Sequence, residues 1–582
     1  MKKIDIHYHL LMEKPHTHLF TVQISLTGLS ESYQIFSMPV WTPGSYLVRD
    51  FCKNVQNVSA YSKNKSLNVT KLNKNTWRVE TNNNKKITLK YQVYAFDLTV
   101  RTSFLDIDHA MINGASVFMC PNGFEHNRGM LTLEPYFEWS KVTTELTPDK
   151  GDKHRFQIEN YDQLVDTPIE LGNQIIESFK ASGINHDYAI IGKGNPDYKT
   201  ILDDSIKILE EAHKIFRDIP YDHYTFFLYL TDNAYGGLEH KNCCSLIYDR
   251  WKFTKREDYI KFMGLVSHEY FHVYNVKRIR PKELGPFDYS KENYTNLLWI
   301  AEGMTAYYDN LLLRRSSVIN TEEYLKLLAD DIQRYEAIPG RYVQSVSESS
   351  FDAWIKLYQS NENTINSTIS YYLKGSLIAL GLDFSIRKHT TNTKSLDDVY
   401  KILWDNYKKT NNGFSEDDFI NICEQVAGCS LENIWTIVHS KEEFDIDKIL
   451  SSAGLITLRE YKDKKDVNKS TIGIIFDEDK LIIKQISAQS PAYLGGLNVK
   501  DEMIAVNDIR LTPKNVKERI SSLSIESESN FTVNRDGLLR NIQISPIKLP
   551  KNKYSIVPMK NADKLQKSIY ENWLNESWNN GK

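Results

Sequence analysis

Residues 1 to about 165 show the alternation of apolar and polar side chains that is typical of β-strands, in which successive residues point to opposite faces. Runs rich in β-branched and aromatic residues recur, and turn-forming stretches such as 41–46 (WTPGSY) separate them. The clearest runs are 18–26 (HLFTVQISL), 76–81 (TWRVET), 86–96 (KITLKYQVYAF) and 154–161 (HRFQIENY). The pattern predicts an N-terminal antiparallel β domain over residues 1–165, arranged as a sandwich or a saddle.

Beyond this domain the apolar residues recur at intervals of three and four, which is the period of a helix with one buried face. The pattern predicts a helix at 196–219, a strand at 224–232, a glycine turn at 233–242, and helices at 257–280 and 296–315. Helical patterns dominate to about residue 455. We therefore expect a domain over residues 166–460 whose C-terminal part is helical.

The pattern changes again after a charged, weakly hydrophobic linker at 461–470 (YKDKKDVNKS). Short strands then alternate with turns as far as about residue 548, so a small separate domain is predicted over 466–548. The last stretch, 549–582, begins with prolines and carries a helical run at 562–578 (ADKLQKSIYENWLNESW). We expect it to be a C-terminal tail.

Composition narrows the class of protein only a little. The chain has 582 residues, 41% of them hydrophobic and 25% charged, and its net charge of −3 offers no case for binding nucleic acid or a membrane surface. No apolar run reaches 18 residues, and the first 20 residues lack the apolar segment of a signal peptide. The six cysteines form no C-x-x-C pair, which favours reduced thiols. These features predict a cytoplasmic protein without a membrane span.

The candidate chemistry lies in residues 264–281 (GLVSHEYFHVYNVKRIRP), where His268, Glu269 and His272 form an H-E-x-x-H pattern. Residues i and i+4 of a helix share a face, so both imidazoles can bind one metal ion. A zinc hydrolase uses three protein ligands and leaves a fourth position for water, which a neighbouring glutamate deprotonates. The alternative is a helix whose histidines simply face the core.

The third ligand is expected on the apolar helix at 296–315, which carries Glu302 early in its course. A carboxylate among apolar neighbours needs a partner, and a metal ion supplies one. The alternative is an exposed glutamate near a bend. Asp309, two turns later, could orient a ligand histidine, although a surface acid explains it equally well.

Several longer stretches resemble a known family. H-E-x-x-H followed by W-x-x-E-G is the gluzincin pattern of thermolysin and the aminopeptidase N superfamily. The fuller match is to the glycyl aminopeptidase family with a C-terminal PDZ module, and it extends over nearly the whole chain. The matching stretches are 38–51 (MPVWTPGSYLVRDF), 267–290 (SHEYFHVYNVKRIRPKELGPFDYS), 297–318 (LLWIAEGMTAYYDNLLLRRSSV) and 371–387 (YYLKGSLIALGLDFSIR). The resemblance implies a multidomain α+β fold with a thermolysin-like zinc peptidase domain over 166–460.

The resemblance also implies roles for single residues. His268, His272 and Glu302 correspond to the zinc ligands and Glu269 to the general base. In addition, residues 236–240 (GGLEH) resemble the G-x-M-E-N loop, so Gly236, Gly237 and Glu239 are expected to bind the substrate, with the glutamate on its α-amine. His240 and Leu238 depart from that loop, and Glu239 could instead be an ordinary turn acid.

A tyrosine is the last catalytic candidate. Residues 372–375 (YLKG) resemble the Y-x-K-G pattern whose tyrosine stabilises the tetrahedral intermediate, which implies that role for Tyr372. Tyr371 is a competing candidate, and either tyrosine could be a core aromatic.

The segment 466–548 resembles a PDZ domain through residues 490–511 (SPAYLGGLNVKDEMIAVNDIRL). Its peptide-binding loop is expected at 471–475 (TIGII), where backbone N–H groups would hold a peptide C-terminus. A PDZ fold used only for intramolecular packing is the alternative. His7 and His9 near the N-terminus are expected to lie on a solvated strand rather than at a second metal site.

These features together predict a zinc aminopeptidase that removes N-terminal residues from peptides, and the resemblance implies a preference for small residues such as Gly or Ala. Two rivals stay open: an endopeptidase with the same zinc centre, and a non-catalytic scaffold that only positions the PDZ module. The sequence does not predict an oligomeric state.

Overall fold

A computed structural model describes residues 4–578; residues 1–3 and 579–582, which belong to the predicted first domain and tail, lie outside the described part. The chain forms two compact units. The first runs to Thr295 and also includes Tyr308–Ile319 and Tyr400–Phe419. The second comprises Asn296–Tyr307, Asn320–Val399 and the chain from Ile420 onward. The fold is therefore multidomain α+β, with an N-terminal antiparallel β domain and a helical peptidase domain.

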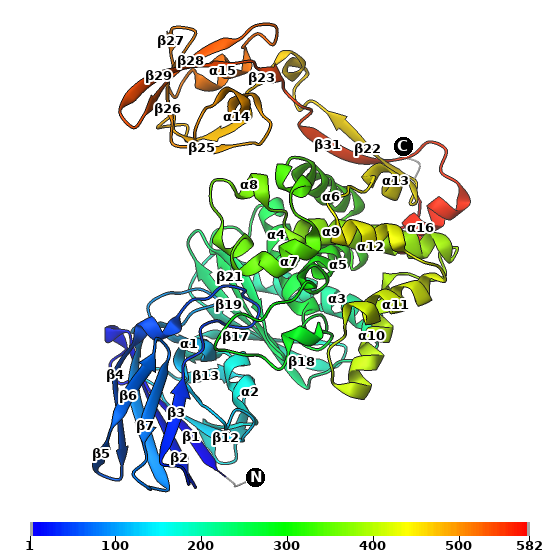
Figure 1. Cartoon of the computed structure of the whole chain (residues 1–582). Helices are drawn as coiled ribbons and strands as arrows, with labels where there is room; N and C mark the ends of the chain where they lie inside the picture. The colour runs from blue at the N-terminus through cyan, green and yellow to red at the C-terminus, as the bar shows by residue number, and fades with distance from the viewer. Residues whose placement is uncertain (1–3, 579–582) are drawn as a thin grey trace. The chain divides into compact units, whose positions relative to one another are not determined.

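The first unit begins with the predicted β domain (Figure 1). An eight-stranded sheet has the order β14-β15-β12-β1-β2-β8-β4-β5, and every neighbouring pair is antiparallel except β1 with β12. The strands of this sheet are β1 (Asp5–Leu11), β2 (Leu19–Thr27), β4 (Val55–Ser62), β5 (Lys65–Leu67), β8 (Lys86–Tyr94), β12 (Gly129–Glu134), β14 (Thr147–Asp149) and β15 (Asp152–Ile158). Two four-stranded sheets, β13-β16-β10-β9 and β11-β3-β7-β6, complete the domain. Their strands are β3 (Tyr33–Ser37), β6 (Val69–Asn73), β7 (Thr76–Glu80), β9 (Phe104–Leu105), β10 (Ala110–Ile112), β11 (Cys120–Pro121), β13 (Lys141–Thr144) and β16 (Ile169–Gly172).

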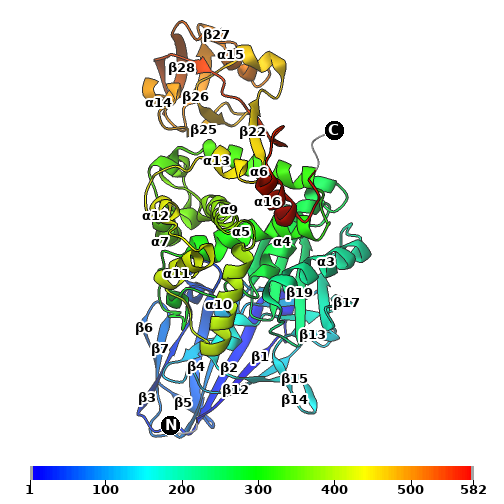
Figure 2. The same ribbon diagram turned by 90° about the vertical axis from the view of Figure 1, so that its right-hand side faces the viewer.

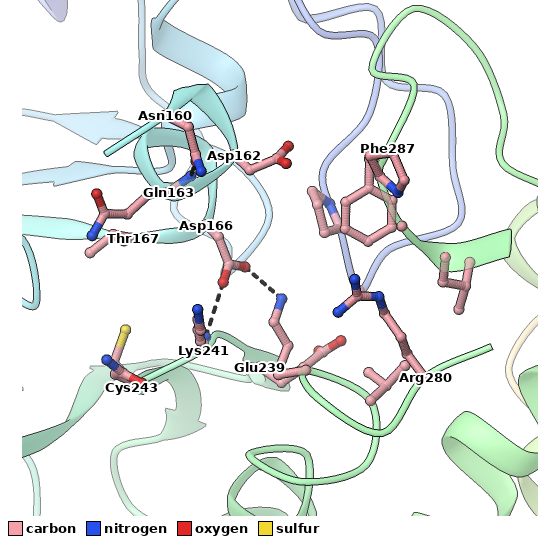
Figure 3. Close-up of a pocket in the computed structure, with 18 of the residues that line it drawn as sticks. Asn160, Asp162, Gln163, Asp166, Thr167, Glu239, Lys241, Cys243, Arg280 and Phe287 are labelled. Carbon is pink, nitrogen blue, oxygen red and sulfur yellow. Dashed lines mark hydrogen bonds and ion pairs between the residues drawn. The ribbon is translucent and has the colours of Figure 1, made fainter. Parts of the chain in front are cut away.

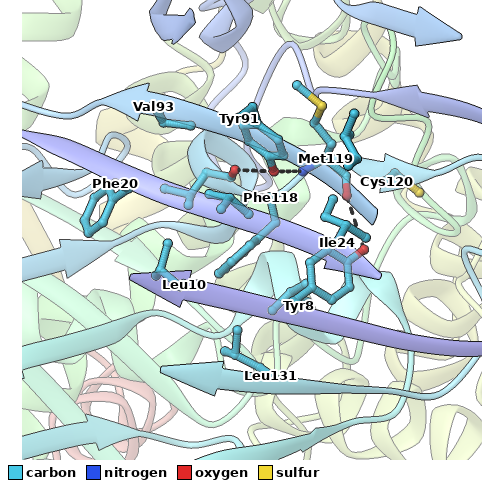
Figure 4. Packing of buried hydrophobic residues seen from close by; sticks show 14 of the residues in the cluster. Tyr8, Leu10, Phe20, Ile24, Tyr91, Val93, Phe118, Met119, Cys120 and Leu131 are labelled. Atoms are coloured by element: carbon cyan, nitrogen blue, oxygen red, sulfur yellow. Dashed lines mark hydrogen bonds between the residues drawn. The ribbon is translucent and has the colours of Figure 1, made fainter. Parts of the chain in front are cut away.

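The core of this domain is packed from the inward-facing residues of the alternating strands (Figure 4). Leu10, Phe20 and Ile24 have no exposed surface. The buried hydroxyl of Tyr91 is paired on both sides, as buried polar groups usually are. It donates to the carbonyl of Val117 at 2.9 Å and accepts from the backbone N–H of Met119. The period-two pattern therefore predicts both the strands and the face that each buries.

The peptidase part of the first unit is built on a five-stranded sheet with the order β17-β18-β19-β21-β20. Its strands are β17 (Ile175–Ala181), β18 (Ile184–Ile191), β19 (His223–Thr231), β20 (Tyr235–Glu239) and β21 (Cys243–Asp249), and helices α3 (Tyr198–Phe216) and α4 (Arg256–Phe271) belong to the same part (Figure 2). The glycine turn predicted at 233–242 is wrong over its middle, where β20 pairs antiparallel with β21. Glycine within a strand often marks a position where another group approaches closely, and here the carboxylate of Glu269 leaves no room for a Cβ atom on Gly237.

Helix α4 ends at Phe271, so the prediction of a helix to residue 280 is wrong at its C-terminal end. Beyond it the chain turns, and Arg278 lies in the part predicted as helix. The guanidinium of Arg278 donates hydrogen bonds to the carbonyl oxygens of Val273, Lys241 and Pro220, at 2.8, 2.8 and 2.9 Å. The bond to Val273 satisfies a backbone acceptor that a continuing helix would satisfy by itself, and the other two tie this turn to neighbouring segments.

The second unit is dominated by helices, as predicted. A π-helical turn at Trp299–Gly303 (η4) leads into α5 (Met304–Arg315), a helix that contributes residues to both units. The other helices of more than ten residues that lie wholly or mostly in this unit are α6 (Thr321–Glu336), α9 (Tyr371–His389), α11 (Glu416–Ala427) and α16 (Lys564–Leu574). Helix α10 (Leu396–Thr410) lies mostly in the first unit. The shorter ones are α7 (Val346–Phe351), α8 (Thr364–Ser367), α12 (Glu432–His439) and α13 (Ile446–Ser451).

The small C-terminal module is an insertion in a two-stranded ribbon. Strand β22 (Leu455–Glu460) pairs antiparallel with β31 (Lys553–Pro558), and the module lies between them in the sequence. Its core is its own, and its largest sheet has the order β27-β26-β28-β29. These strands are β26 (Glu502–Val506), β27 (Ile509–Arg510), β28 (Ser529–Arg535) and β29 (Leu538–Ile544).

The segment after the module packs into the second unit through α16, where Trp573 and Leu574 are completely buried. None of the described helices is long and apolar enough to cross a membrane. All six cysteines are free thiols.

Candidate metal and peptide site

The two histidines of the H-E-x-x-H pattern point at a common position. Their Nε2 atoms are 3.1 Å apart. Each Nδ1 atom faces an oxygen: that of His272 lies 2.6 Å from the carbonyl of Asn275, and that of His268 lies 3.3 Å from a carboxylate oxygen of Asp309. An Nδ1–H donated to these acceptors leaves a lone pair on each Nε2.

Two lone pairs at this separation repel one another unless a cation lies between them. Two nitrogen ligands of one tetrahedral zinc ion, each about 2.1 Å from the metal, are roughly 3.4 Å apart. The separation of the two Nε2 atoms is close to this value. His268 and His272 therefore fit a metal ion, and the bonds from their Nδ1 atoms fix the tautomer that binding requires.

Helices α4 and α5 run alongside each other within the first unit. The hydroxyl of Ser267 donates to the carbonyl of Asp309 at 2.8 Å, and the rings of Phe271 and Tyr308 stack with centroids 4.6 Å apart. The side chain of Asp309 is 15% exposed and its carboxylate faces Nδ1 of His268, so it is not an isolated surface acid.

Glu269 is buried beneath strand β20, with 5% of its surface exposed. Gly237 lies directly over it, and a Cβ atom at that position would overlap the carboxylate of Glu269. Glu239, at the end of the same strand, is 4% exposed. One possible ligand atom of each of Glu239, Glu269 and His272 falls within 4.8 Å of the others. The edge strand therefore brings the H-E-x-x-H pattern and the GGLEH segment to one place.

The segment that follows Glu239 is fixed by an ionic cluster around Asp166, the last residue of α2 (Tyr161–Asp166) (Figure 3). One carboxylate oxygen of Asp166 lies 2.6 Å from the ammonium of Lys277 and 3.4 Å from Nδ1 of His240, and the other accepts the backbone N–H of Lys241 at 3.0 Å. Burial by itself raises the pKa of Asp166, but the charge of Lys277 and the hydrogen bond with His240 lower it to about 2.

Arg278 acts on the same segment. Besides its three backbone carbonyls, it donates to the side-chain oxygen of Asn242 at 2.9 Å. The basic stretch that follows the metal-binding helix therefore has a structural role: Lys277 and Arg278 tie the end of β20 to the end of α4.

A cavity of about 450 Å³ opens beside Glu239. Residues from the N-terminal β domain and from the peptidase part both line it, among them Gly44, Asp162, Arg280 and Phe287 (Figure 3). The cavity gives Glu239 an open approach that its nearly complete burial would otherwise prevent.

The second unit carries the other two candidates. Glu302 lies in the π-helical turn and is 2% exposed. The turn is pressed against α9, because a Cβ atom on Gly303 would come within 2.6 Å of Cα of Gly375. Tyr372 is the second residue of α9 and is partly exposed, whereas the neighbouring Tyr371 is fully buried. Burial, and after it the negative charge of Glu302, raises the pKa of Tyr372 well above its usual range.

Sequence reasoning missed four residues: Gly44, Asp166, Lys277 and Arg278. The stretch 41–46 shows only that a turn is present, and no local pattern pairs Asp166 with Lys277 across more than a hundred residues. His7 and His9 lie on β1 and are both partly exposed. Nε2 of His9 pairs with Glu134 at 2.7 Å.

Comparison with known proteins gives two family matches: the peptidase M61 N-terminal domain over residues 7–173, and M61 glycyl aminopeptidase over residues 261–378. An aminopeptidase N family protein from Idiomarina loihiensis is similar over 97% of this chain and 100% of its own, with 32% identity and a TM-score of 0.90. No curated protein matches.

Two more distant structures are similar over part of the chain. An M1 zinc metallopeptidase from Deinococcus radiodurans bound to a Tyr-Ser-Ala substrate has 11% identity and a TM-score of 0.48, and covers 76% of this chain and 95% of its own. Legionella pneumophila aminopeptidase A in complex with aspartic acid has 12% identity and a TM-score of 0.48, and covers 82% of this chain and 54% of its own.

Proposed function

Because this chain belongs to the M61 glycyl aminopeptidase family of metallopeptidases, we propose that it is a zinc aminopeptidase that removes N-terminal residues, small ones such as Gly or Ala above all, from peptides. The observation that carries the proposal is the convergence of two imidazole Nε2 atoms, 3.1 Å apart, beside Glu239 and Glu269.

His268, His272 and Glu302 are the proposed zinc ligands. Glu302 precedes Asp309 by seven residues and lies in an apolar stretch, where a carboxylate needs a partner. A π-helical turn, rare in proteins and frequent at functional sites, carries Glu302.

Bound zinc would lower the pKa of a water molecule to about 7 and polarise the scissile carbonyl. Glu269 takes the proton of the attacking water and passes it to the leaving amine. The hydroxyl of Tyr372 donates a hydrogen bond to the negative charge that develops on the carbonyl oxygen, and its raised pKa keeps that proton in place.

Glu239 accepts the charged α-amine of the substrate. A carboxylate held on a strand edge binds an ammonium group through charge-assisted hydrogen bonds. Gly236 and Gly237 lie on β20, the edge strand of the five-stranded sheet, to which the substrate backbone can add as an extra strand. A peptide bound this way has its first peptide bond beside Glu269, which is why we assign exopeptidase rather than endopeptidase activity.

We also propose that residues 466–548 form a PDZ domain. The loop that contains Gly473, whose φ is +78°, leads into β24 (Ile474–Phe476), a strand that pairs in the described structure only with β25 (Ile483–Ile486). The other edge of β24 could accept the C-terminus of a peptide. An intramolecular contact would use the same edge.

Metal analysis combined with the variant Glu269→Gln tests the proposed mechanism. The purified protein should contain one zinc ion per chain, and a chelator should abolish hydrolysis of an alanyl reporter substrate that added zinc restores. Glu269→Gln should keep the zinc and lose at least ~100-fold in kcat. Equal turnover in the variant would exclude Glu269 as the base, and a protein without zinc or turnover would indicate a scaffold.

A further inference from the structure

A turn of the N-terminal β domain touches the proposed amine-binding carboxylate. Gly44, in the turn Thr42–Ser45, has a φ of +81°. A Cβ atom at this position would lie 2.6 and 2.7 Å from the two carboxylate oxygens of Glu239 and 2.7 Å from a methyl carbon of Leu238. Real Cβ atoms do not approach so closely, so only glycine fits without moving Glu239.

The turn cannot easily move back to make room. The backbone N–H of Ser45 donates to the carbonyl of Thr42 at 3.1 Å, and the hydroxyl of Thr42 lies 3.4 Å from the side chain of Asn113. Trp41 is completely buried, and its indole N–H donates to the carbonyl of Asp288 at 2.9 Å. The residues that precede Gly44 are therefore anchored outside the turn, and the bond from Ser45 to Thr42 closes the turn around Gly44.

Glu239 lies close both to this turn and to the H-E-x-x-H residues. Its carboxylate contacts Gly44, and one of its oxygens lies within 4.8 Å of possible ligand atoms of Glu269 and His272. We propose that Gly44 is a positioning residue. By contact with the Glu239 carboxylate, the turn fixes its distance from Glu269, so that one substrate can place its amine at Glu239 and its first peptide bond at Glu269.

This inference rests on the proposed function of Glu239. It adds that the N-terminal β domain completes the substrate site, and that the absence of a side chain at Gly44 is required for substrate affinity.

The test compares Gly44→Ala with Gly123→Ala. Gly123 has a nearly identical φ of +87°, but a Cβ atom there would meet nothing within 4 Å. Both variants therefore impose the same left-handed strain on alanine, and only one displaces Glu239. With a free-amine alanyl reporter, Gly44→Ala should raise KM at least tenfold with a smaller change in kcat, whereas Gly123→Ala should change KM less than twofold.

Binding of alaninamide, measured by calorimetry on the zinc-loaded protein, gives a readout independent of turnover. Gly44→Ala should weaken it at least tenfold. The double variant Gly44→Ala with Glu239→Asp should lose less affinity for alaninamide than the product of the two single-variant losses. The shorter aspartate side chain withdraws from the added Cβ atom and so relieves the contact. If the double variant shows the full product of losses, the contact is not the cause.

Thr42→Val provides a second route if Gly44→Ala does not fold. It removes the hydroxyl that faces Asn113 and adds nothing near Glu239, and we expect a KM increase of a few-fold. Equal KM values for Gly44→Ala and Gly123→Ala, or an unchanged KM for Thr42→Val, would overturn the inference. A wild-type protein without preference for free amines would instead refute the proposed role of Glu239.

Discussion

Two glycines of strand β20 differ sharply in what surrounds them. Gly237 lies over Glu269 and has no room for a side chain, whereas a Cβ atom on Gly236 would lie 3.5 Å from the guanidinium of Arg101, an ordinary contact. Gly237→Ala should therefore push Glu269 out of position and lower kcat by about 100-fold or more, the usual contribution of a general base. Gly236→Ala should lower kcat less than about threefold.

The comparison is made on steady-state kinetics with the same alanyl reporter, with zinc content measured for both variants. Similar kcat values in the two variants would show that Glu269 adapts to the added methyl group. Because both substitutions are on the same strand edge, a general weakening of β20 would lower both rates alike.

The sequence alone predicts which types of residue form the site but not the distances between them. His268, Glu269 and His272 follow from a helical period, and Glu302 from a carboxylate in an apolar run. Gly44 could not be identified, because its constraint is the position of a carboxylate almost two hundred residues away.

At the scale of elements, the end of β20 depends on the buried ion pair of Asp166 with Lys277. Asp166→Asn leaves the ammonium of Lys277, whose side chain is 9% exposed, without its counter-ion. Breaking a buried pair on one side costs about 3–5 kcal/mol. We expect that loss in the free energy of unfolding at pH 7, measured with denaturant, and a much smaller change for the exposed Asp203→Asn.

The pH dependence follows from the lowered pKa of Asp166. Its folded-state pKa of about 2 lies below the ordinary value of 3.8, so its stabilising contribution is present above that value and is lost as the pH falls through about 2. The difference in stability between wild type and Asp166→Asn should shrink between about pH 4 and pH 2. A difference that stays constant over this range would exclude ionised Asp166 as its source.

Elements were predicted well where one periodicity acts alone. The strands of the β domain and helix α3 are examples. The errors occur where long-range partners replace local ones: β20 is a strand because β21 pairs with it despite its glycines, and α4 ends at Phe271 because Arg278 binds carbonyls from three separate segments.

At the scale of the whole molecule, the C-terminal module interrupts the ribbon of β22 and β31. Glu460 pairs directly with Lys553, so the two strands can be joined without the module. Replacing residues 462–550 by an Asn-Gly turn should leave a folded protein with a Tm within a few degrees of the wild type, by thermal unfolding.

Truncation after Glu460 is the matched control, because it also removes β31 and α16. Trp573 and Leu574 are completely buried, and losing one large core side chain costs about 3–5 kcal/mol. The truncated protein should be unfolded or aggregated. If both shortened proteins unfold alike, the module is not an insertion that the rest of the chain tolerates losing.

The insertion was not predicted. The sequence shows a linker and a change of pattern near residue 461, but the return of the chain through β31 and α16 depends on a pairing that no local signal carries. The last segment was predicted as a tail, and its helix is part of a core.

The most direct test of the account is the ratio of kcat/KM for a free-amine peptide to that for its N-acetylated form, in wild type and in Glu239→Gln. The account predicts a wild-type ratio of at least ~100 and a loss of at least tenfold of that ratio in the variant, because a neutral amide no longer pairs with the ammonium group. An unchanged ratio would show that Glu239 does not recognise the amine, and an equal rate on both peptides would make the enzyme an endopeptidase.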